Sequence, residues 1–165
     1  MVFARTKLMI HDELFKPRPV VRIHFSGAHP EKLYHEIPNL VTKAFKVSEH
    51  AMMEKKFSWL KGEPERFKIL WEIDKDLDRF SYYWMEIELS GTVSKGSGTG
   101  EVVVVSALRT EYPQDTFWER SLFYEFMRMI WHNAFYARKR EEWLVEGRRL
   151  VSLLVDNIKQ ITKEI

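Results

Sequence analysis

The sequence predicts a single α+β domain spanning residues 1–165, in which a meander of antiparallel strands packs against a long helical segment at the C-terminus. Residues 66–74 and 79–89 alternate apolar and polar side chains, which is the pattern of strands buried on one face. From Asp115 onward the apolar residues recur at helical spacing, and no proline follows. A chain of 165 residues is also the size of one domain.

The first 19 residues predict an N-terminal arm without an assigned element. The arm ends in Lys16-Pro-Arg-Pro19, where two prolines break any helix. Val20 to Phe25 then alternates as a strand does, and residues 26–30 form a turn. Apolar residues recur at helical spacing over residues 30–46, but Pro38 interrupts them. The pattern therefore predicts either two short helices or one kinked helix.

Four strands are predicted in the middle of the chain, at residues 51–60, 66–74, 79–89 and 101–112. A loop at Asp74–Asp78 separates the second from the third, and a glycine-rich turn at Ser94–Gly100 separates the third from the fourth. The fourth strand has the most β-branched residues, and Pro113 ends it. The section 20–113 is thus one strand, a short helical stretch and a meander.

The C-terminal section, residues 115–165, divides into two helical parts. Residues 116–137 are apolar nearly all round, which predicts a helix buried on more than one side. Residues 141–165 carry a single apolar stripe and predict an amphipathic helix. Arg138-Lys-Arg140 either marks a break between the two parts or lies within one continuous helix.

The composition predicts a folded globular protein with a heavily charged surface. Aromatic residues make up 14% of the chain and charged residues 30%, and disordered chains are poor in aromatics. The net charge of +2 does not require a nucleic-acid partner. There is no cysteine, no secretory signal and no apolar run of membrane-spanning length, so we expect a cytoplasmic protein without membrane insertion. The abundance of Lys, Arg and Glu is also thermophile-like.

Several short motifs resemble ligand sites but have simpler explanations. A phosphate-binding loop at Gly96–Gly100 would need a helix directly after the glycines, and a strand follows instead. Asp74–Asp78 lacks the glycine and the glutamate of a calcium loop. His24, His29 and His35 do not have the spacing of a zinc site. We therefore assign no metal and no cofactor.

No residue is assigned a catalytic role. His132 would be a general base if it faced a cavity, but a partly buried histidine with a structural partner is the more common arrangement. The chain has no nucleophile elbow. The sequence thus leans towards a protein that is not an enzyme.

The aromatic excess is the most informative feature for function, and three explanations stay open. The rings fill the core, or they line an apolar pocket between a curved sheet and a helix, or they cover a subunit interface on residues 116–137. A separate basic cluster at residues 138–149 is interpreted as a solvated helix face or, more weakly, as a nucleic-acid patch.

The layout resembles the helix-grip fold, the superfamily of START lipid-transfer domains, the major birch-pollen allergen and polyketide cyclases. Two stretches carry this likeness. Residues 20–37 read VVRIHFSGAHPEKLYHEI, similar to the family's first strand and the helix after it. Residues 98–113 read GTGEVVVVSALRTEYP, similar to a late strand.

This resemblance implies a cavity for an apolar small molecule or lipid between the sheet and the C-terminal helix. The residues that it places on the cavity wall are Trp71, Tyr83, Met85, Val103 and Val105 on the sheet, with Leu150 and Leu154 on the helix. The leading hypothesis is therefore a helix-grip-like binding protein. The alternatives are a homodimer formed through residues 116–137 and, more weakly, a nucleic-acid-binding protein.

Overall fold

The computed structural model describes residues 8–16, 18–112 and 122–165. Its strands are β1 (Leu8–Glu13), β2 (Val20–Gly27), β3 (Met52–Leu60), β4 (Glu65–Asp76), β5 (Ser81–Ser94) and β6 (Ser97–Tyr112). Its helices are α1 (Glu31–Phe45), the short 3₁₀ helix η1 (Glu49–Ala51), α2 (Leu122–Trp131), the π-helix η3 (His132–Tyr136) and α3 (Ala137–Glu164). The predicted α+β class and the long C-terminal helix are confirmed.

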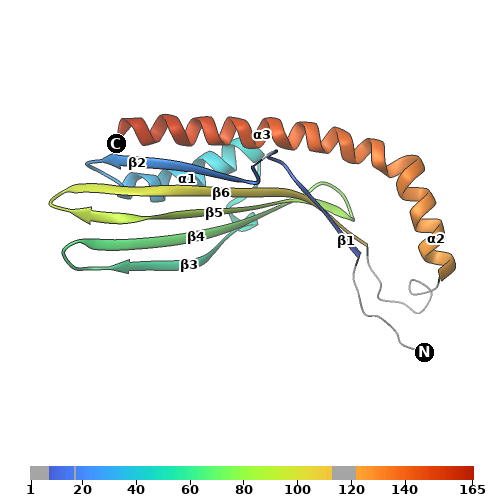
Figure 1. The fold of residues 1–165 in the computed structure, drawn as a ribbon, viewed down its shortest axis with the longest axis horizontal. Helices are drawn as coiled ribbons and strands as arrows, with labels where there is room; N and C mark the ends of the chain where they lie inside the picture. The colour runs from blue at the N-terminus through green and yellow to red at the C-terminus, as the bar shows by residue number, and fades with distance from the viewer. Residues whose placement is uncertain (1–7, 17, 113–121) are drawn as a thin grey trace, which may run out of the picture.

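The sheet has six strands, and every pairing between them is antiparallel. Strands β3, β4, β5 and β6 follow one another as a meander, as the sequence predicts. The second edge of β6 is shared, because β2 pairs with Gly98–Val105 and β1 pairs with Ala107–Tyr112. The two N-terminal strands therefore run in the same direction along one partner (Figure 1).

Strand β1 is absent from the sequence prediction, which leaves residues 1–19 as an arm. Its residues Leu8–Glu13 show no clean alternation, so only the pairing with β6, about 100 residues away, makes them a strand. Leu14 follows directly, with its amide donating to the Ser106 carbonyl and its side chain 2% exposed. Residues 8–14 of the predicted arm are therefore part of the sheet and of the core.

Helix α1 is one continuous helix in spite of Pro38, which decides between the two sequence predictions. Pro30 lies at its N-terminus, and Leu33, Ile37, Val41 and Phe45 are buried at a spacing of four residues. This single buried stripe packs towards the core. The helix ends at Lys46, which has a left-handed φ of 52°.

The glycine-rich segment at Ser94–Gly100 is mostly strand rather than turn. Ser94 pairs with Ser97, and Lys95 and Gly96 between them have φ of 50° and 79°, as a type I′ hairpin turn requires. Gly100 belongs to β6, where a Cβ would lie 2.2 Å from the Ser90 carbonyl oxygen and 2.7 Å from the Phe25 ring. The glycines thus serve a tight turn and close packing, and the element that follows them is a strand rather than the helix that a phosphate-binding loop needs.

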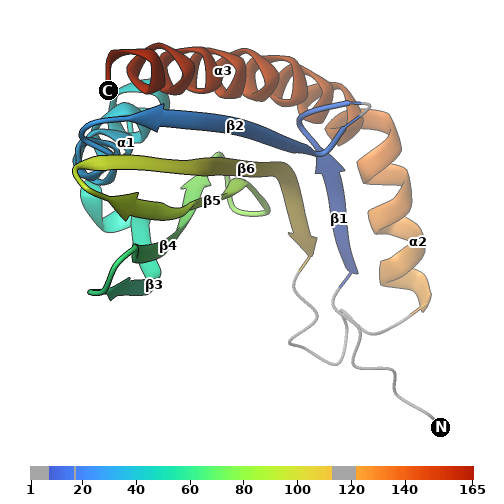
Figure 2. The same cartoon turned by 60° about the vertical axis from the view of Figure 1, so that its left-hand side comes forward.

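The C-terminal helical segment bends where α2 meets α3. Helix α3 lies along one face of the sheet, and α2 turns down beside the end of the sheet (Figures 1 and 2). The five residues of η3 form the junction, and π-helical turns are a common cause of such bends. Arg138–Arg140 lies inside α3, so the helix runs through. Residues 116–121 of the predicted aromatic helix lie outside the described residues.

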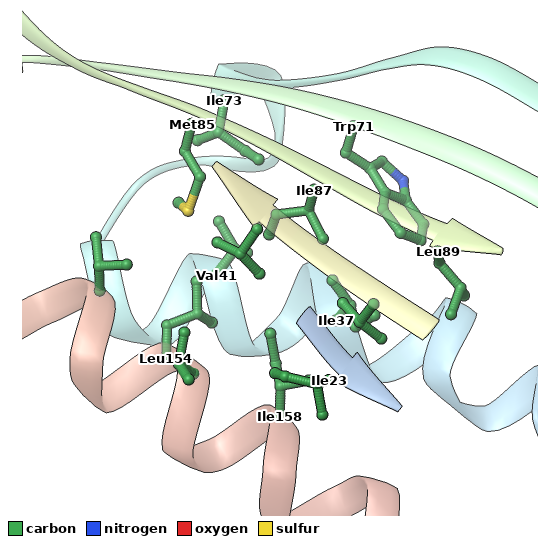
Figure 3. Packing of buried hydrophobic residues seen from close by; sticks show 14 of the residues in the cluster. Ile23, Ile37, Val41, Trp71, Ile73, Met85, Ile87, Leu89, Leu154 and Ile158 are labelled. Carbon is green, nitrogen blue, oxygen red and sulfur yellow. The ribbon is translucent and has the colours of Figure 1, made fainter. Parts of the chain in front are cut away.

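The core lies between the sheet and a layer formed by α1 and α3 (Figure 3). Val151, Leu154 and Ile158 of α3 are completely buried against apolar side chains of α1 and the sheet. The carbonyl of Ile165 accepts a hydrogen bond of 2.8 Å from the Ala28 amide, which fixes the end of α3 to the turn after β2. The stripe predicted for residues 141–165 is the face that closes the sheet.

Leu153 and Leu154 provide a matched test of this packing, because they are neighbours on α3 with 47% and 0% exposure. We expect Leu154→Ala to lower the free energy of unfolding by about 2–5 kcal/mol, since it leaves a cavity in the core. Leu153→Ala should change the same quantity by less than about 0.5 kcal/mol. Urea denaturation followed by circular dichroism measures both, and equal effects would contradict the assigned helix orientation.

Candidate functional site

Five of the seven side chains placed on a cavity wall by the sequence lie together in the packed core. Trp71, Tyr83, Met85, Leu150 and Leu154 all belong to the central apolar cluster and are at most 8% exposed. The structure thus brings the sheet and helix members of this group together. They act there as core residues, and Tyr83 also donates a hydrogen bond of 2.6 Å to the Trp143 carbonyl of α3.

The placement of Val103 and Val105 on that wall is wrong. They pair with Glu88 and Glu86 of β5, on the polar face of the sheet, while Val102 and Val104 point into the core. Side chains alternate between the two faces of a strand, so a run of four valines in the sequence does not show which two face inward. Only the register with β5 decides it.

An apolar pocket lies at the other end of the molecule, between α2, η3 and the end of the sheet. Its volume is about 550 Å³, within the range of roughly 300–1,000 Å³ that is usual for small-molecule sites. Five of its wall residues are aromatic: Phe80, Tyr112, Tyr124, Trp131 and Phe135. Met127, Ile130 and Arg128 complete the wall.

The pocket walls come from three distant parts of the chain. Phe80 precedes β5, Tyr112 ends β6, and the other wall residues belong to α2 and η3. The guanidinium of Arg128 lies 5.3 Å from the centre of the Tyr112 ring, and both side chains are buried. The pocket therefore depends on how α2 is held against the end of the sheet.

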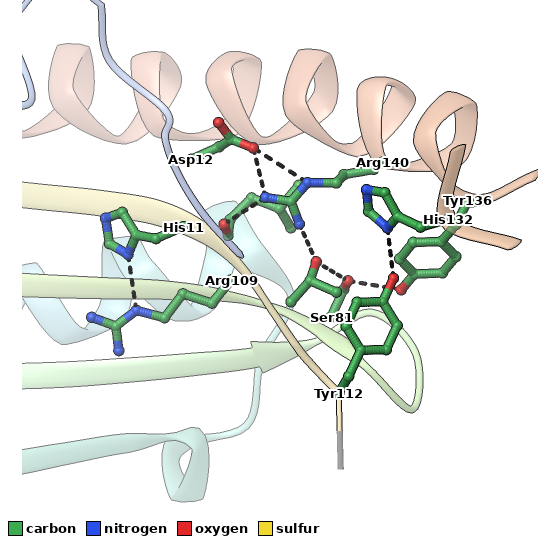
Figure 4. A network of polar contacts seen from close by, with 10 residues as sticks. His11, Asp12, Ser81, Arg109, Tyr112, His132, Tyr136 and Arg140 are labelled. Atoms are coloured by element: carbon green, nitrogen blue, oxygen red, sulfur yellow. Dashed lines mark hydrogen bonds and ion pairs between the residues drawn. The ribbon is translucent and has the colours of Figure 1, made fainter. Parts of the chain in front are cut away.

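A chain of buried polar contacts next to the pocket holds that arrangement (Figure 4). Tyr136 of η3 lies 2.8 Å from Ser81 Oγ and donates to Asp78 Oδ1 at 2.9 Å. Ser81 Oγ lies 2.6 Å from Thr110 Oγ1, which also accepts a hydrogen bond from Arg140 of α3. The chain thus links both C-terminal helical elements to β5 and β6.

One set of hydrogen positions satisfies every member of this polar chain. Arg140 can only donate and the Asp78 carboxylate can only accept. The three hydroxyls between them then each accept once and donate once, in the order Thr110, Ser81, Tyr136. Hydrogen bonds that all run in one direction strengthen one another in a buried setting. The network therefore holds η3 and α3 in a fixed position on the sheet.

Each end of this series of hydrogen bonds is a charged group, Arg140 or Asp78, that has polar partners of its own. Arg140 Nη2 lies 2.6 Å from Asp12 Oδ2 on β1 and also donates to the Leu108 carbonyl. Burial raises the pKa of the Tyr136 phenol, and its hydrogen bond to Asp78 raises it further. Burial also acts to raise the pKa of Asp78, but hydrogen bonds from the Phe80 and Ser81 amides and from Tyr136 outweigh it and hold that pKa below its usual value. The phenol therefore stays protonated and the carboxylate stays charged.

His132 and Tyr112 form a second polar contact at the pocket. Tyr112 Oη lies 2.6 Å from His132 Nδ1, with the ring centres 6.0 Å apart. Burial lowers the pKa of His132, and the positive charges of Arg140 and Arg128 lower it further. Burial raises the pKa of Tyr112. A protonated phenol therefore donates to a neutral imidazole, and the histidine has the structural partner that the sequence left open.

The other sequence motifs have structural roles where the structure describes them. The loop predicted at Asp74–Asp78 is wrong in its first half, because Asp74–Asp76 belong to β4. The turn comes after them, and Asp78 Oδ1 accepts hydrogen bonds there from the amides of Phe80 and Ser81. Within residues 8–16, 18–112 and 122–165, no group of three or more His, Asp or Glu side chains could hold a metal ion. In the same ranges, no helix is both long and apolar enough to cross a membrane.

The basic cluster at residues 138–149 is largely paired with carboxylates. Arg140 is buried against Asp12. Arg138 lies 3.6 Å from Glu142, and Arg149 lies 2.8 Å from Glu146. Lys139 lies 3.6 Å from Asp78 and stacks over the Trp143 ring. A phosphate backbone would have to compete with these carboxylates.

Comparison with known proteins leaves the chain without a family. None of the known protein families matches it, and no curated protein matches it either. Among solved structures, a norcoclaurine synthase mutant from Thalictrum flavum in complex with a transition-state analogue aligns over 96% of this chain and 97% of its own. The identity is 11% and the TM-score is 0.29, so this match supports no statement about the fold or the activity of this chain.

Sequence reasoning missed most of the polar chain. Asp12 lies in the segment left without an element, and Ser81 and Thr110 are ordinary strand residues in the sequence. One signal was available, because His132 and Tyr136 are four residues apart in a predicted helix and so lie on one face. Their partners on the sheet come from 20 to 55 residues earlier in the chain, which no local pattern reveals.

The buried Arg140, which pairs with the partly exposed Asp12, should contribute more to stability than an arginine in a fully exposed pair does. We expect Arg140→Met to lower the free energy of unfolding by about 2–4 kcal/mol, because Asp12 and Thr110 lose their donor in a partly dry site. Arg149→Met, which breaks the exposed pair with Glu146, should change it by about 0–1 kcal/mol. If chemical denaturation gave similar changes for the two variants, the hydrogen-bonded contacts of Arg140 would not be what anchors α3.

The lowered pKa of His132 predicts how stability depends on pH. In the unfolded chain this histidine takes up a proton near pH 6.5, whereas in the folded protein it does so only at a lower pH. Because the unfolded state binds more protons in this range, the free energy of unfolding falls as the pH drops through it. Replacing His132 by Gln should make the free energy of unfolding vary less between pH 7 and pH 5. The exposed His24, changed to Gln, serves as control, and an unchanged pH dependence in the His132 variant would refute the assignment.

Proposed function

We propose that the protein binds an apolar small molecule, such as a single acyl chain, in the pocket beside α2. The observation that carries the proposal is the pocket itself: about 550 Å³, with five aromatic rings among its eight wall residues. Burying an apolar ligand against such walls is favourable in proportion to the area removed from water. The site differs from the sequence expectation, which placed the ligand against Trp71 and Tyr83.

The polar groups at this pocket support binding rather than turnover. Tyr112 and His132 are hydrogen-bonded to each other at 2.6 Å, and both keep their protonation state near neutral pH. A nucleophile or base would have to leave this bond before it could react. Tyr112 is a wall residue and His132 is not, so the phenol held by His132 gives the pocket one fixed polar group against which the polar end of a ligand can orient.

The wall residues also keep the pocket shaped without a ligand. Phe80 and Tyr112 have their ring centres 5.5 Å apart, and Trp131 and Phe135 have theirs 5.2 Å apart. Such ring pairs favour fixed relative positions. A pre-formed wall lowers the ordering entropy that a ligand has to overcome.

Filling the pocket tests the proposal. Ile130 lines it and is 42% exposed, so Ile130→Trp adds bulk without disturbing the central core. The probe is 11-(dansylamino)undecanoate, followed by its fluorescence. We expect the unaltered protein to bind it at one site and the variant to bind at least about tenfold more weakly, because the tryptophan occupies the volume of the chain.

Leu153→Trp is the matched control, since it makes the same kind of change on an exposed position of α3 outside the pocket. It should bind the probe as the unaltered protein does. Native mass spectrometry of freshly purified protein adds a second readout, a co-purifying apolar ligand. Equal probe binding by the Ile130→Trp variant, or no saturable binding by the unaltered protein, would refute the proposal.

A further inference from the structure

Helix α2 and η3 expose far more apolar surface than any other part of the described chain. Their large apolar side chains with 41% to 73% exposure are Phe123, Phe126, Met127, Met129, Ile130, Trp131 and Phe135. Exposed charged side chains are what a solvated helix normally presents. The helix itself turns away from the body of the molecule beside the end of the sheet (Figures 1 and 2).

The area involved is that of a protein interface. At about 200 Å² for a fully exposed large side chain, these seven side chains expose roughly 750 Å². The largest apolar patch on a typical monomer is about 300–600 Å². A stable interface of standard size buries about 800 Å² on each partner, which is close to what α2 and η3 offer.

The residue types are also those of the centre of an interface. Phe, Trp and Met are enriched there, and charged residues are depleted. Phe123, Phe126 and Met129 are not part of the pocket wall, whereas four of the seven residues belong to both surfaces: Met127, Ile130, Trp131 and Phe135. The exposed patch is therefore continuous with the pocket but extends beyond it on the outer side of α2.

We propose that this surface, the α2–η3 face, pairs with the same surface of a second copy of the chain. A twofold axis brings each patch onto its own equivalent, so one apolar helix face is enough to form a closed dimer. A membrane surface fits the flanking charges less well, because lipid-binding helices carry an unopposed basic face. Here the nearest exposed arginine, Arg138, is paired with Glu142.

The pairing also explains why so short a helix projects from the body. α2 has 10 residues, and its Arg128 lies over the Tyr112 ring at the pocket. The hydrogen bonds to the sheet come from His132 and Tyr136 of η3, which follows α2 directly. A second copy would remove the outer side from water and flank the pocket with a second apolar wall. The inference stands on the exposed area and does not depend on a ligand in the pocket.

The experiment is to introduce charge on the outer side of α2 and to measure the mass in solution. By sedimentation equilibrium, the unaltered protein should have twice the chain mass of 19.8 kDa at micromolar concentration. The double variant Phe123→Glu/Phe126→Glu should have the mass of one chain, because two like charges on each partner would meet at the axis. Circular dichroism confirms that this variant is folded.

Leu153→Glu is the control, because Leu153 is an apolar residue exposed to 47% that lies outside the α2–η3 face. It should stay dimeric. A second readout uses the absence of cysteine from the chain. Under oxidation Phe126→Cys should give a covalent dimer, and Leu153→Cys should not.

A monomeric unaltered protein, or a double variant that remains dimeric, would overturn the proposal. A monomer that co-sediments with vesicles of phosphatidylcholine and phosphatidylglycerol would assign the face to lipid instead. Neither Phe123 nor Phe126 lines the pocket, so the double variant tests the dimer without altering the pocket wall.

Discussion

The antiparallel pairing along β6 is the constraint on which the rest of the structure depends. This strand of 16 residues pairs with β5 over one edge and with both β1 and β2 over the other. Its inward side chains, such as Val102 and Val104, form the floor on which α1 and α3 pack. Its C-terminal end, which includes Thr110 and Tyr112, extends beyond the edge of that core. One half of β6 therefore contributes to the core, and the other half contributes to the candidate site.

The far half of β6 is held to the helices by polar rather than apolar contacts. Arg140, Thr110, Ser81, Tyr136 and Asp78 form one directed chain of hydrogen bonds. Hydrogen bonds have defined lengths and directions, whereas apolar contacts tolerate sliding. The chain thus sets the position of η3 on the sheet. Because α2 precedes η3 directly, the same contacts set the pocket.

Helix α2 is the part of the structure that the fold itself does not need. The apolar core cluster includes residues of α1 and α3 and none of α2, whose described apolar side chains line the pocket or are exposed to water. A chain retains exposed Phe, Met and Trp side chains at a solubility disadvantage, since such patches promote association. The two proposals give α2 two uses. Its pocket-lining residues hold a ligand, and the exposed face that extends beyond the pocket to Phe123, Phe126 and Met129 meets a second copy.

The sequence by itself determined the elements that have a local pattern. Alternation predicted β2, β4 and β5, a run of β-branched residues predicted β6, and helical spacing predicted α1 and α3. The single stripe of residues 141–165 identified the face that covers the sheet. It also separated residues 116–137 as unusually apolar, which is where the pocket lies. Local patterns suffice for these features because side-chain direction repeats with the backbone.

Only the tertiary structure decided which residues meet. Strand β1 exists through pairing with β6, and the choice between Val102 and Val103 as core residues depends on register with β5. The polar chain joins Asp12 to Arg140 across 128 positions of sequence. The predicted ligand wall at Trp71 and Tyr83 is packed core, and the pocket lies beside α2 instead. Contacts between distant segments follow from how the layers close, and no window of sequence contains that information.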